Sequence, residues 1–207
     1  MPKKETPLHF LQQFIPEGSY ELLQPFFETH TIHLTLTRER KTVLGDYRAP
    51  TSEKPFHRIS VNVNLNKYSF LITLLHELAH LATWLQHQHK VPPHGAEWKQ
   101  QFQQLLTPFF GKHFFPKEVE NALWKYLHNP AASTCTDTFL FKALYQNDTQ
   151  KEGYKLVDDV LIGEQFMAEN GKIFKKVKKQ RSRARCLEMS SGKFYLFPGI
   201  VEVKTVH

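Results

Sequence analysis

The chain has 207 residues, with 27 Lys and Arg against 20 Asp and Glu and a formal net charge of +7. Its 41% hydrophobic and 13% aromatic residues are typical of a globular protein, which excludes low-complexity, fibrous and wholly disordered classes. A chain of this length buries about 70% of the surface that its unfolded form exposes, so it can build a core without disulfide bonds.

Cysteine usage indicates a reducing compartment. Cys135 and Cys186 are too few for a disulfide framework or a four-cysteine metal site, and we expect both to be buried or neutral thiols. Met1–Glu5 lead into no long apolar run, and the most apolar stretch, residues 70–75, is far short of a membrane span. We therefore expect a cytoplasmic protein with no membrane partner.

Two segments alternate apolar and polar residues as half-buried strands do, residues 31–37 and 59–65. A loop that includes Gly45–Arg48 lies between them, so we expect the two strands to pair antiparallel.

Helical periodicity predicts several helices in the first 150 residues. They cover residues 8–15, 20–29, 66–89, 95–105, 117–129 and 136–145. Ser19 is placed to cap the second of them. The helix over residues 66–89 is apolar on more than one face, which indicates that it is buried.

The pattern changes again after Asp148, where turn dipeptides separate short β-branched and aromatic runs. The sequence therefore predicts an α+β protein. We expect zincin-like helices packed on a small antiparallel sheet over residues 1–150, followed by a small, mostly β module over residues 155–207.

The most informative motif is His76-Glu77-Leu78-Ala79-His80, an H-E-x-x-H pattern on the predicted buried helix. A spacing of four residues puts both imidazoles on one face, one turn apart, so that they can bind the same zinc ion. Glu77 lies about 100° around the helix from His76, beside such a metal, where it can take a proton from a water.

The context of the motif supports this interpretation, because buried polar residues in an apolar helix need partners that a metal would supply. Gln86 stands where the metzincin pattern requires its third histidine, which excludes that subclass. His94-Gly95 follows His80 by fourteen residues, after a Pro92-Pro93 turn that could fold the chain back toward the first two histidines.

At these residues the sequence resembles the SprT-like zinc metalloproteases, the family that includes proteases of the Spartan type. The resembling segments are Gly45–Arg48, Ile59–Asn62, Leu75–His80 and His94–Lys99. The resemblance covers about residues 8–150 and implies one zinc ion on His76, His80 and His94, with Glu77 as the catalytic carboxylate. The chain departs from many members at its C-terminus, where it has a lone Cys186 in place of a four-cysteine zinc ribbon, so a second zinc is not expected.

A basic stretch in the C-terminal module is a candidate nucleic-acid contact. Residues 172–185 contain eight Lys and Arg and no acid. If residues 181–185 form a strand, their three arginines share one face at intervals of about 6.6 Å, which suits phosphate oxygens. The candidate residues are Lys175, Lys176, Lys178, Lys179, Arg181, Arg183 and Arg185, with Phe174 and Tyr195 as candidate stacking surfaces for single-stranded DNA.

Together these features predict a zinc-dependent metallopeptidase that hydrolyses peptide bonds, with DNA-associated proteins as substrates and DNA as a partner of the basic module. Simpler readings are a chance motif in a packed helix, and a solvated strand face for the basic stretch. The alternative function is a nucleic-acid-binding or transcription-associated protein whose SprT-like domain holds zinc without catalysis.

Overall fold

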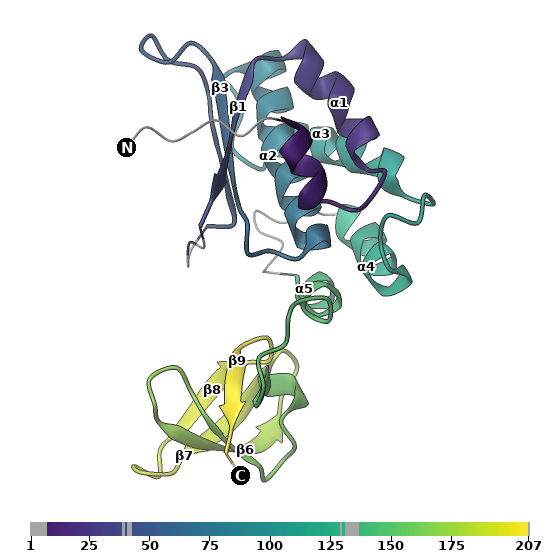
Figure 1. Cartoon of the computed structure of the whole chain (residues 1–207). Coiled ribbons are helices and arrows are strands. Elements are labelled where there is room, and N and C mark those ends of the chain that lie inside the picture. The colour runs from purple at the N-terminus through teal and green to yellow at the C-terminus, as the bar shows by residue number, and fades with distance from the viewer. Residues whose placement is uncertain (1–7, 39, 41–42, 129, 131–136, 207) are drawn as a thin grey trace. The chain divides into compact units, whose positions relative to one another are not determined.

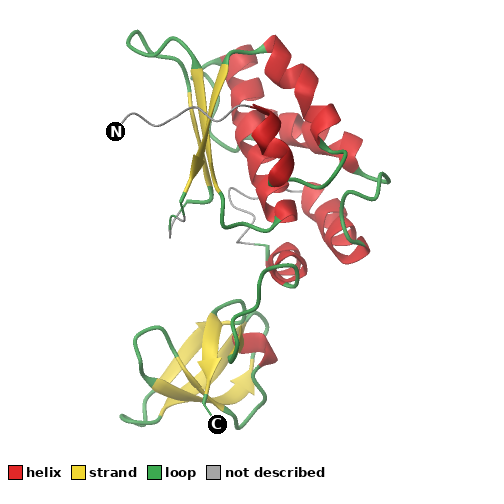
Figure 2. Ribbon diagram, viewed as in Figure 1, coloured by secondary structure: helices red, strands yellow, loops and turns green. Residues whose placement is uncertain are grey.

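The computed structural model describes residues 8–38, 40, 43–128, 130 and 137–206. The chain divides into two compact units, Met1–Asp148 and Thr149–His207. Helices and a small sheet form the first unit and a curled antiparallel sheet the second (Figure 2), which confirms the predicted α+β class. Among the described residues, the helices are too short or too polar to cross a bilayer.

The sheet of the first unit has three strands, β1 (Ile32–Thr37), β2 (Gly45–Arg48) and β3 (His57–Asn62), in the order β1-β3-β2. β1 and β3 pair parallel, so the predicted antiparallel pairing is wrong. The reason is β2, a strand where we expected only a loop. β2 and β3 pair antiparallel, which leaves the other side of β3 to β1 and makes β2 one of the two edge strands.

The helical elements of the first unit are η1 (Leu8–Gln13), α1 (Tyr20–Thr29), α2 (Lys67–His87), α3 (Ala96–Leu106), η2 (Thr107–Phe109), α4 (Lys117–Leu127) and α5 (Thr138–Tyr145). Helices α1, α2 and α3 lie on one side of this sheet (Figure 1), and α2 packs directly against β2 and β3. The predicted start of α5, Thr136, lies outside the described residues. Ser19 precedes α1 but does not cap it, because its hydroxyl donates to the carbonyl of Pro16.

Helix α2 is the centre of the first unit. Asn66 caps its N-terminus by accepting hydrogen bonds from the backbone N–H groups of Tyr68 and Ser69. Most of its side chains between Phe70 and Thr83 are buried, and it packs against β2, β3 and α3. The motif residues therefore lie at mid-helix, inside the core.

The second unit is a six-stranded antiparallel sheet in the order β4-β9-β5-β6-β7-β8. Its elements are β4 (Tyr154–Leu156), η4 (Val157–Asp159), β5 (Gln165–Met167), β6 (Ile173–Lys179), β7 (Arg183–Glu188), β8 (Phe194–Pro198) and β9 (Glu202–Thr205). Phe166, Phe174 and Val203 are in its small core. Cys186 is buried there too, and burial raises its pKa to about 11. Cys135 lies outside the described residues.

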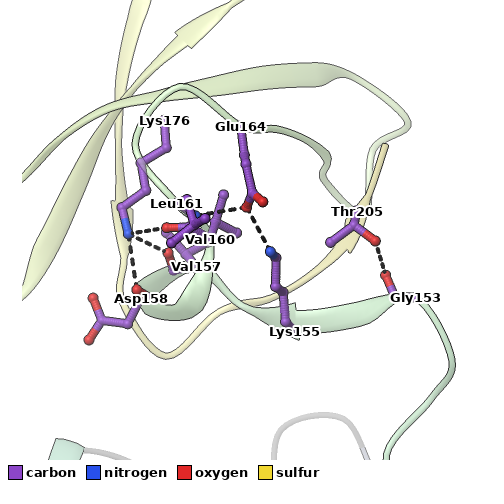
Figure 3. Close-up of polar contacts among 9 residues, drawn as sticks. All are labelled: Gly153, Lys155, Val157, Asp158, Val160, Leu161, Glu164, Lys176 and Thr205. Carbon is purple, nitrogen blue, oxygen red and sulfur yellow. Dashed lines mark hydrogen bonds and ion pairs between the residues drawn. The ribbon is translucent and has the colours of Figure 1, made fainter. Parts of the chain in front are cut away.

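A buried lysine organises one end of this second unit. Only 2% of Lys176 is exposed, and its Nζ donates to the backbone carbonyls of Val157 at 2.9 Å, Asp158 at 3.0 Å and Val160 at 2.7 Å (Figure 3). The three donor positions of an ammonium are thus all used. Next to them, Glu164 accepts from Lys155 Nζ and from the backbone N–H of Leu161, both at 2.7 Å. The ammonium therefore fixes the 157–160 turn against β6.

Replacing Lys176 by Met keeps the length and apolar stem of the side chain and leaves three carbonyls without their donor. We expect Lys176→Met to destabilise the second unit by about 3 kcal/mol, because buried acceptors lose charged hydrogen bonds. Hydrogen–deuterium exchange of the full chain should show faster exchange at residues 154–205 only. The exposed Lys178→Met on the same strand is the matched control, and equal protection in both variants would contradict the structural role of Lys176.

Candidate functional site

Three histidines from two elements converge on one point of the first unit. His76 and His80 lie one turn apart on α2, and His94 lies directly before α3. The Nε2 atom of His94 is 3.1 Å from Nε2 of His76 and 2.9 Å from Nε2 of His80. One ligand atom from each of the three residues lies within 4.8 Å of the others, so this cluster could hold a metal ion.

The turn between α2 and α3 positions His94 next to the other two histidines. Gln88 ends α2 with φ 53°, and its N–H donates to the carbonyl of Trp84. At the far end of the turn His94 has φ 58°, and the N–H of Gly95 donates to the carbonyl of Pro92. The left-handed conformation of a non-glycine residue costs about 1 kcal/mol. The turn therefore bears local strain at the residue that brings the third imidazole to the cluster.

The ring of Trp98 packs against all three histidines. It is fully buried on α3, and its ring centroid lies 4.6 Å from that of His76, 5.4 Å from that of His80 and 4.7 Å from that of His94. The apolar surroundings favour neutral imidazoles, because burial lowers the pKa of His76 to about 3 and that of His80 to about 4. Neutral imidazole is the form that binds metals.

Glu77 lies beside the histidines and is held by the edge strand β2. It is 6% exposed, and burial with the nearby Asp46 charge raises its pKa to about 8. The charge of Arg40 and a hydrogen bond from the backbone N–H of Tyr47 act in the opposite direction. A Cβ atom on Gly45 would lie 2.6 Å from Glu77 Oε1. Only glycine at this position allows β2 to approach the carboxylate so closely.

A buried asparagine holds the segment that leads into β2. The Asn62 side chain donates to the Val43 carbonyl at 3.0 Å and accepts from Arg40 Nε at 2.8 Å. The backbone N–H of Asn62 donates to the carbonyl of Leu44 at 2.9 Å. These contacts fix the position from which β2 passes over Glu77.

The histidines and Glu77 line an open cavity of about 780 Å³. Its lining includes Gly45–Tyr47 of β2 and, from the turn before α3, Gln88, His89 and Val91–His94. A cavity of this size can accept a segment of several residues or a drug-sized molecule. The arrangement thus places a candidate metal-binding cluster and an adjacent carboxylate in one open cavity.

Sequence reasoning did not find two residues of this site. Trp98 and Tyr47 both lie in segments that carry the resemblance, but their periodicity indicated only core packing or a loop. Their contacts with the histidines arise from the approach of α3 and β2 to α2, which no local pattern reports. His89 also lines the cavity.

Only some cations of the basic stretch lie on one face of the sheet. Directly paired residues of an antiparallel sheet share a face, so the pairs Lys178↔Arg185 and Arg183↔Pro198 place these cations on one exposed face of β6, β7 and β8. Lys175 lies on the same face, because it pairs with Leu187, which is two residues after Arg185 on β7. Lys179 lies 3.6 Å from a carboxylate oxygen of Asp158, and Arg181 precedes β7, so the expected row of three arginines on one strand is reduced to two.

Lys176 does not belong to this face. Its burial and its three carbonyl partners keep its ammonium away from any phosphate, which corrects the prediction for this residue. Phe174 is buried as well. Tyr195 is exposed, as is Phe194 on β8, which has the guanidinium of Arg185 3.8 Å above its ring centroid.

The fold and the site define a domain in which a buried H-E-x-x-H helix and a third histidine form a candidate metal centre. The sequence profile of the SprT-like family matches residues 12–119, which include the three histidines, Glu77 and β2. The match covers more than half of the chain, so the protein belongs to the SprT-like family, as its sequence predicted. Searches of curated proteins and of solved structures found no match.

The contribution of His94 can be tested by removing its imidazole. We expect His94→Ala to keep the fold and to lose most of the bound metal, because two ligands from one helix turn hold a metal ion poorly. Metal analysis of purified protein after dialysis measures the loss. His87→Ala, at the end of α2, is the control. Full metal retention in His94→Ala would assign the third ligand to His87, His89 or Glu97 instead.

Proposed function

We propose that this protein is a zinc-dependent metallopeptidase. The observation that carries the proposal is the convergence of three neutral imidazoles beside a buried carboxylate in an open cavity. Membership in the SprT-like family supports it. Three histidines with a further position left for water or substrate are a donor set that catalytic zinc sites use.

The spacing of the nitrogens fits zinc. A tetrahedral zinc ion with Zn–N bonds of about 2.0–2.1 Å holds its ligand nitrogens about 3.3 Å apart. The Nε2 separations of 3.1 and 2.9 Å are close to this value. His76, His80 and His94 would hold the ion, and the nitrogen ligands favour zinc over magnesium or calcium.

When bound, zinc supplies a Lewis acid that polarises the scissile carbonyl and lowers the pKa of water. Glu77 then acts as the proton carrier. Its carboxylate accepts a proton from the attacking water and passes it to the leaving nitrogen of the cleaved peptide bond. Gly45 and the backbone N–H of Tyr47 keep the carboxylate in place for both transfers.

The test replaces the carboxylate by its neutral isostere. We expect Glu77→Gln to retain zinc and the fold and to lose at least about 100-fold in cleavage of casein, because the proton acceptor is absent. The exposed Glu118→Gln on α4 is the control. Undiminished cleavage by Glu77→Gln would contradict the mechanism.

A zinc-loaded wild type that cleaves nothing, with or without DNA, would favour the alternative function. The domain would then hold zinc without catalysis in a nucleic-acid-binding or transcription-associated protein.

We further propose that the second unit binds single-stranded DNA and that the substrates are DNA-associated proteins. The face of β6, β7 and β8 combines the cations Lys175, Lys178, Arg183 and Arg185 with exposed Phe194 and Leu196. Cations beside an exposed ring suit a strand whose phosphates are neutralised while its bases stack. The Arg185–Phe194 contact pre-positions such a stacking surface.

Removing Arg183 and Arg185 together should weaken binding of oligothymidylate and lower the slope of log affinity against log salt by about 1.4. Fluorescence anisotropy at several salt concentrations measures both quantities, and zinc content should not change. Lys151→Ala/Lys204→Ala removes the same charge elsewhere in this unit and is the control. If the arginine variant binds as the wild type does, this face is only a solvated surface.

A further inference from the structure

The cavity contains a side chain that the proton transfers described above do not use. Tyr47 lines the cavity from β2, and its ring is nearly parallel to that of His80, with an interplanar angle of 7° and centroids 6.4 Å apart. Its hydroxyl lies 3.0 Å from Nδ1 of His57 on β3. The backbone N–H of the same residue holds Glu77. Tyr47 therefore contacts the Glu77 carboxylate through its backbone and lies beside His80 through its ring.

A hydrogen-bond donor beside the metal would assist peptide hydrolysis, and neither Glu77 nor the three clustered histidines provide one. Attack on the carbonyl develops negative charge on its oxygen, and a preorganised donor aimed at that oxygen stabilises the transition state. The three histidines are committed to the metal, and Glu77 and Asp46 are acceptors. The hydroxyl of Thr83, also in the cavity wall, already donates to the carbonyl of Ala79 at 2.7 Å.

We propose that Tyr47 donates a hydrogen bond from its hydroxyl to the developing oxyanion, and that His57 positions this hydroxyl. His57 is buried between Tyr47 and Trp84, whose ring it meets edge-on with centroids 5.1 Å apart. With its Nδ1–H donating to the phenolic oxygen, the phenolic proton is free to point into the cavity. The hydroxyl keeps its proton throughout, so Glu77 remains the only proton carrier. This inference rests on the proposed peptidase function.

The first test removes the hydroxyl and keeps the ring. In Tyr47→Phe, zinc content should equal that of the wild type, kcat for a fluorogenic peptide should fall on the order of 100-fold, and KM should stay within about twofold. Tyr68→Phe, at a half-buried tyrosine of the same unit that does not line the cavity, is the matched control.

A binding measurement gives a readout that does not depend on turnover. A phosphinic peptide mimics the tetrahedral transition state, whereas the uncleaved peptide of the same sequence does not. We expect Tyr47→Phe to weaken binding of the phosphinic peptide on the order of 100-fold. Binding of the uncleaved peptide, measured in the Glu77→Gln background, should not change.

The role of His57 is tested by conservative rescue. Gln can still donate a hydrogen bond to the phenolic oxygen, and Leu cannot. The kcat of His57→Gln should therefore stay close to that of the wild type, and the kcat of His57→Leu should fall nearly to that of Tyr47→Phe. Because both residues act through one hydroxyl, the double variant Tyr47→Phe/His57→Leu should be no slower than Tyr47→Phe alone.

The outcomes separate this inference from the proposed function. A wild type that cleaves the peptide, with Tyr47→Phe equally fast, overturns the role of Tyr47 and leaves the peptidase intact. Loss of zinc in Tyr47→Phe overturns it as well, since the residue would then support the metal site. A zinc-loaded wild type that neither cleaves the peptide nor binds the phosphinic mimic overturns both proposals.

Discussion

The burial of polar groups in the middle of α2 is the constraint on which the first unit depends. His76 is 8% and Glu77 6% exposed in a helix whose other central side chains are mostly apolar. Removing such groups from water is unfavourable unless they gain partners. The partners come from outside the helix: the imidazole of His94 and the backbone of β2. Both the turn before α3 and the free edge of the sheet must therefore lie against the same part of α2.

This constraint explains several local features that otherwise look unrelated. Gly45 permits the close passage of β2, Asn62 fixes the segment before it, and the left-handed backbone of His94 directs its ring toward α2. Trp98 then fills the apolar space beneath the imidazoles. Each feature has a small energetic effect, and together they hold the three histidines and Glu77 close to one another.

The second unit satisfies a buried charge in a different way. Here the chain supplies its own cation, the Lys176 ammonium, and surrounds it with backbone carbonyls of a tight turn. Because its neighbours Lys175 and Lys178 remain exposed, one strand serves both the core and a cationic surface. The bulge between Lys176 and Lys178 shifts the register at this position.

Much of the fold and of the candidate site could be predicted from the sequence, because the signals are local. The helical period marks α2, the four-residue spacing places His76 and His80 on one face, and alternation places Arg183 and Arg185 together. The parallel pairing of β1 and β3 could not be predicted, since a period of two residues carries no strand direction. β2 is only four residues long, and its Gly and Asp have low strand propensity, so the sequence does not indicate a strand there.

The same limit applies to single side chains. Nothing near Lys176 in the sequence distinguishes it from the exposed lysines around it, because its partners lie more than fifteen residues earlier in the chain. Tyr47 likewise gains its contacts with Glu77 and His57 only when β2 meets α2 and β3. Tertiary contacts, and not local propensity, determine the environment of both residues.

In the proposed zinc site, three imidazoles of this chain hold the ion and leave room for one further small ligand. X-ray absorption spectroscopy at the zinc edge of the zinc-loaded full chain measures this ligand set. We expect three imidazole nitrogens and one further light atom at about 2.0–2.1 Å. A sulfur shell at about 2.3 Å, or fewer than three imidazoles, would contradict this ligand set.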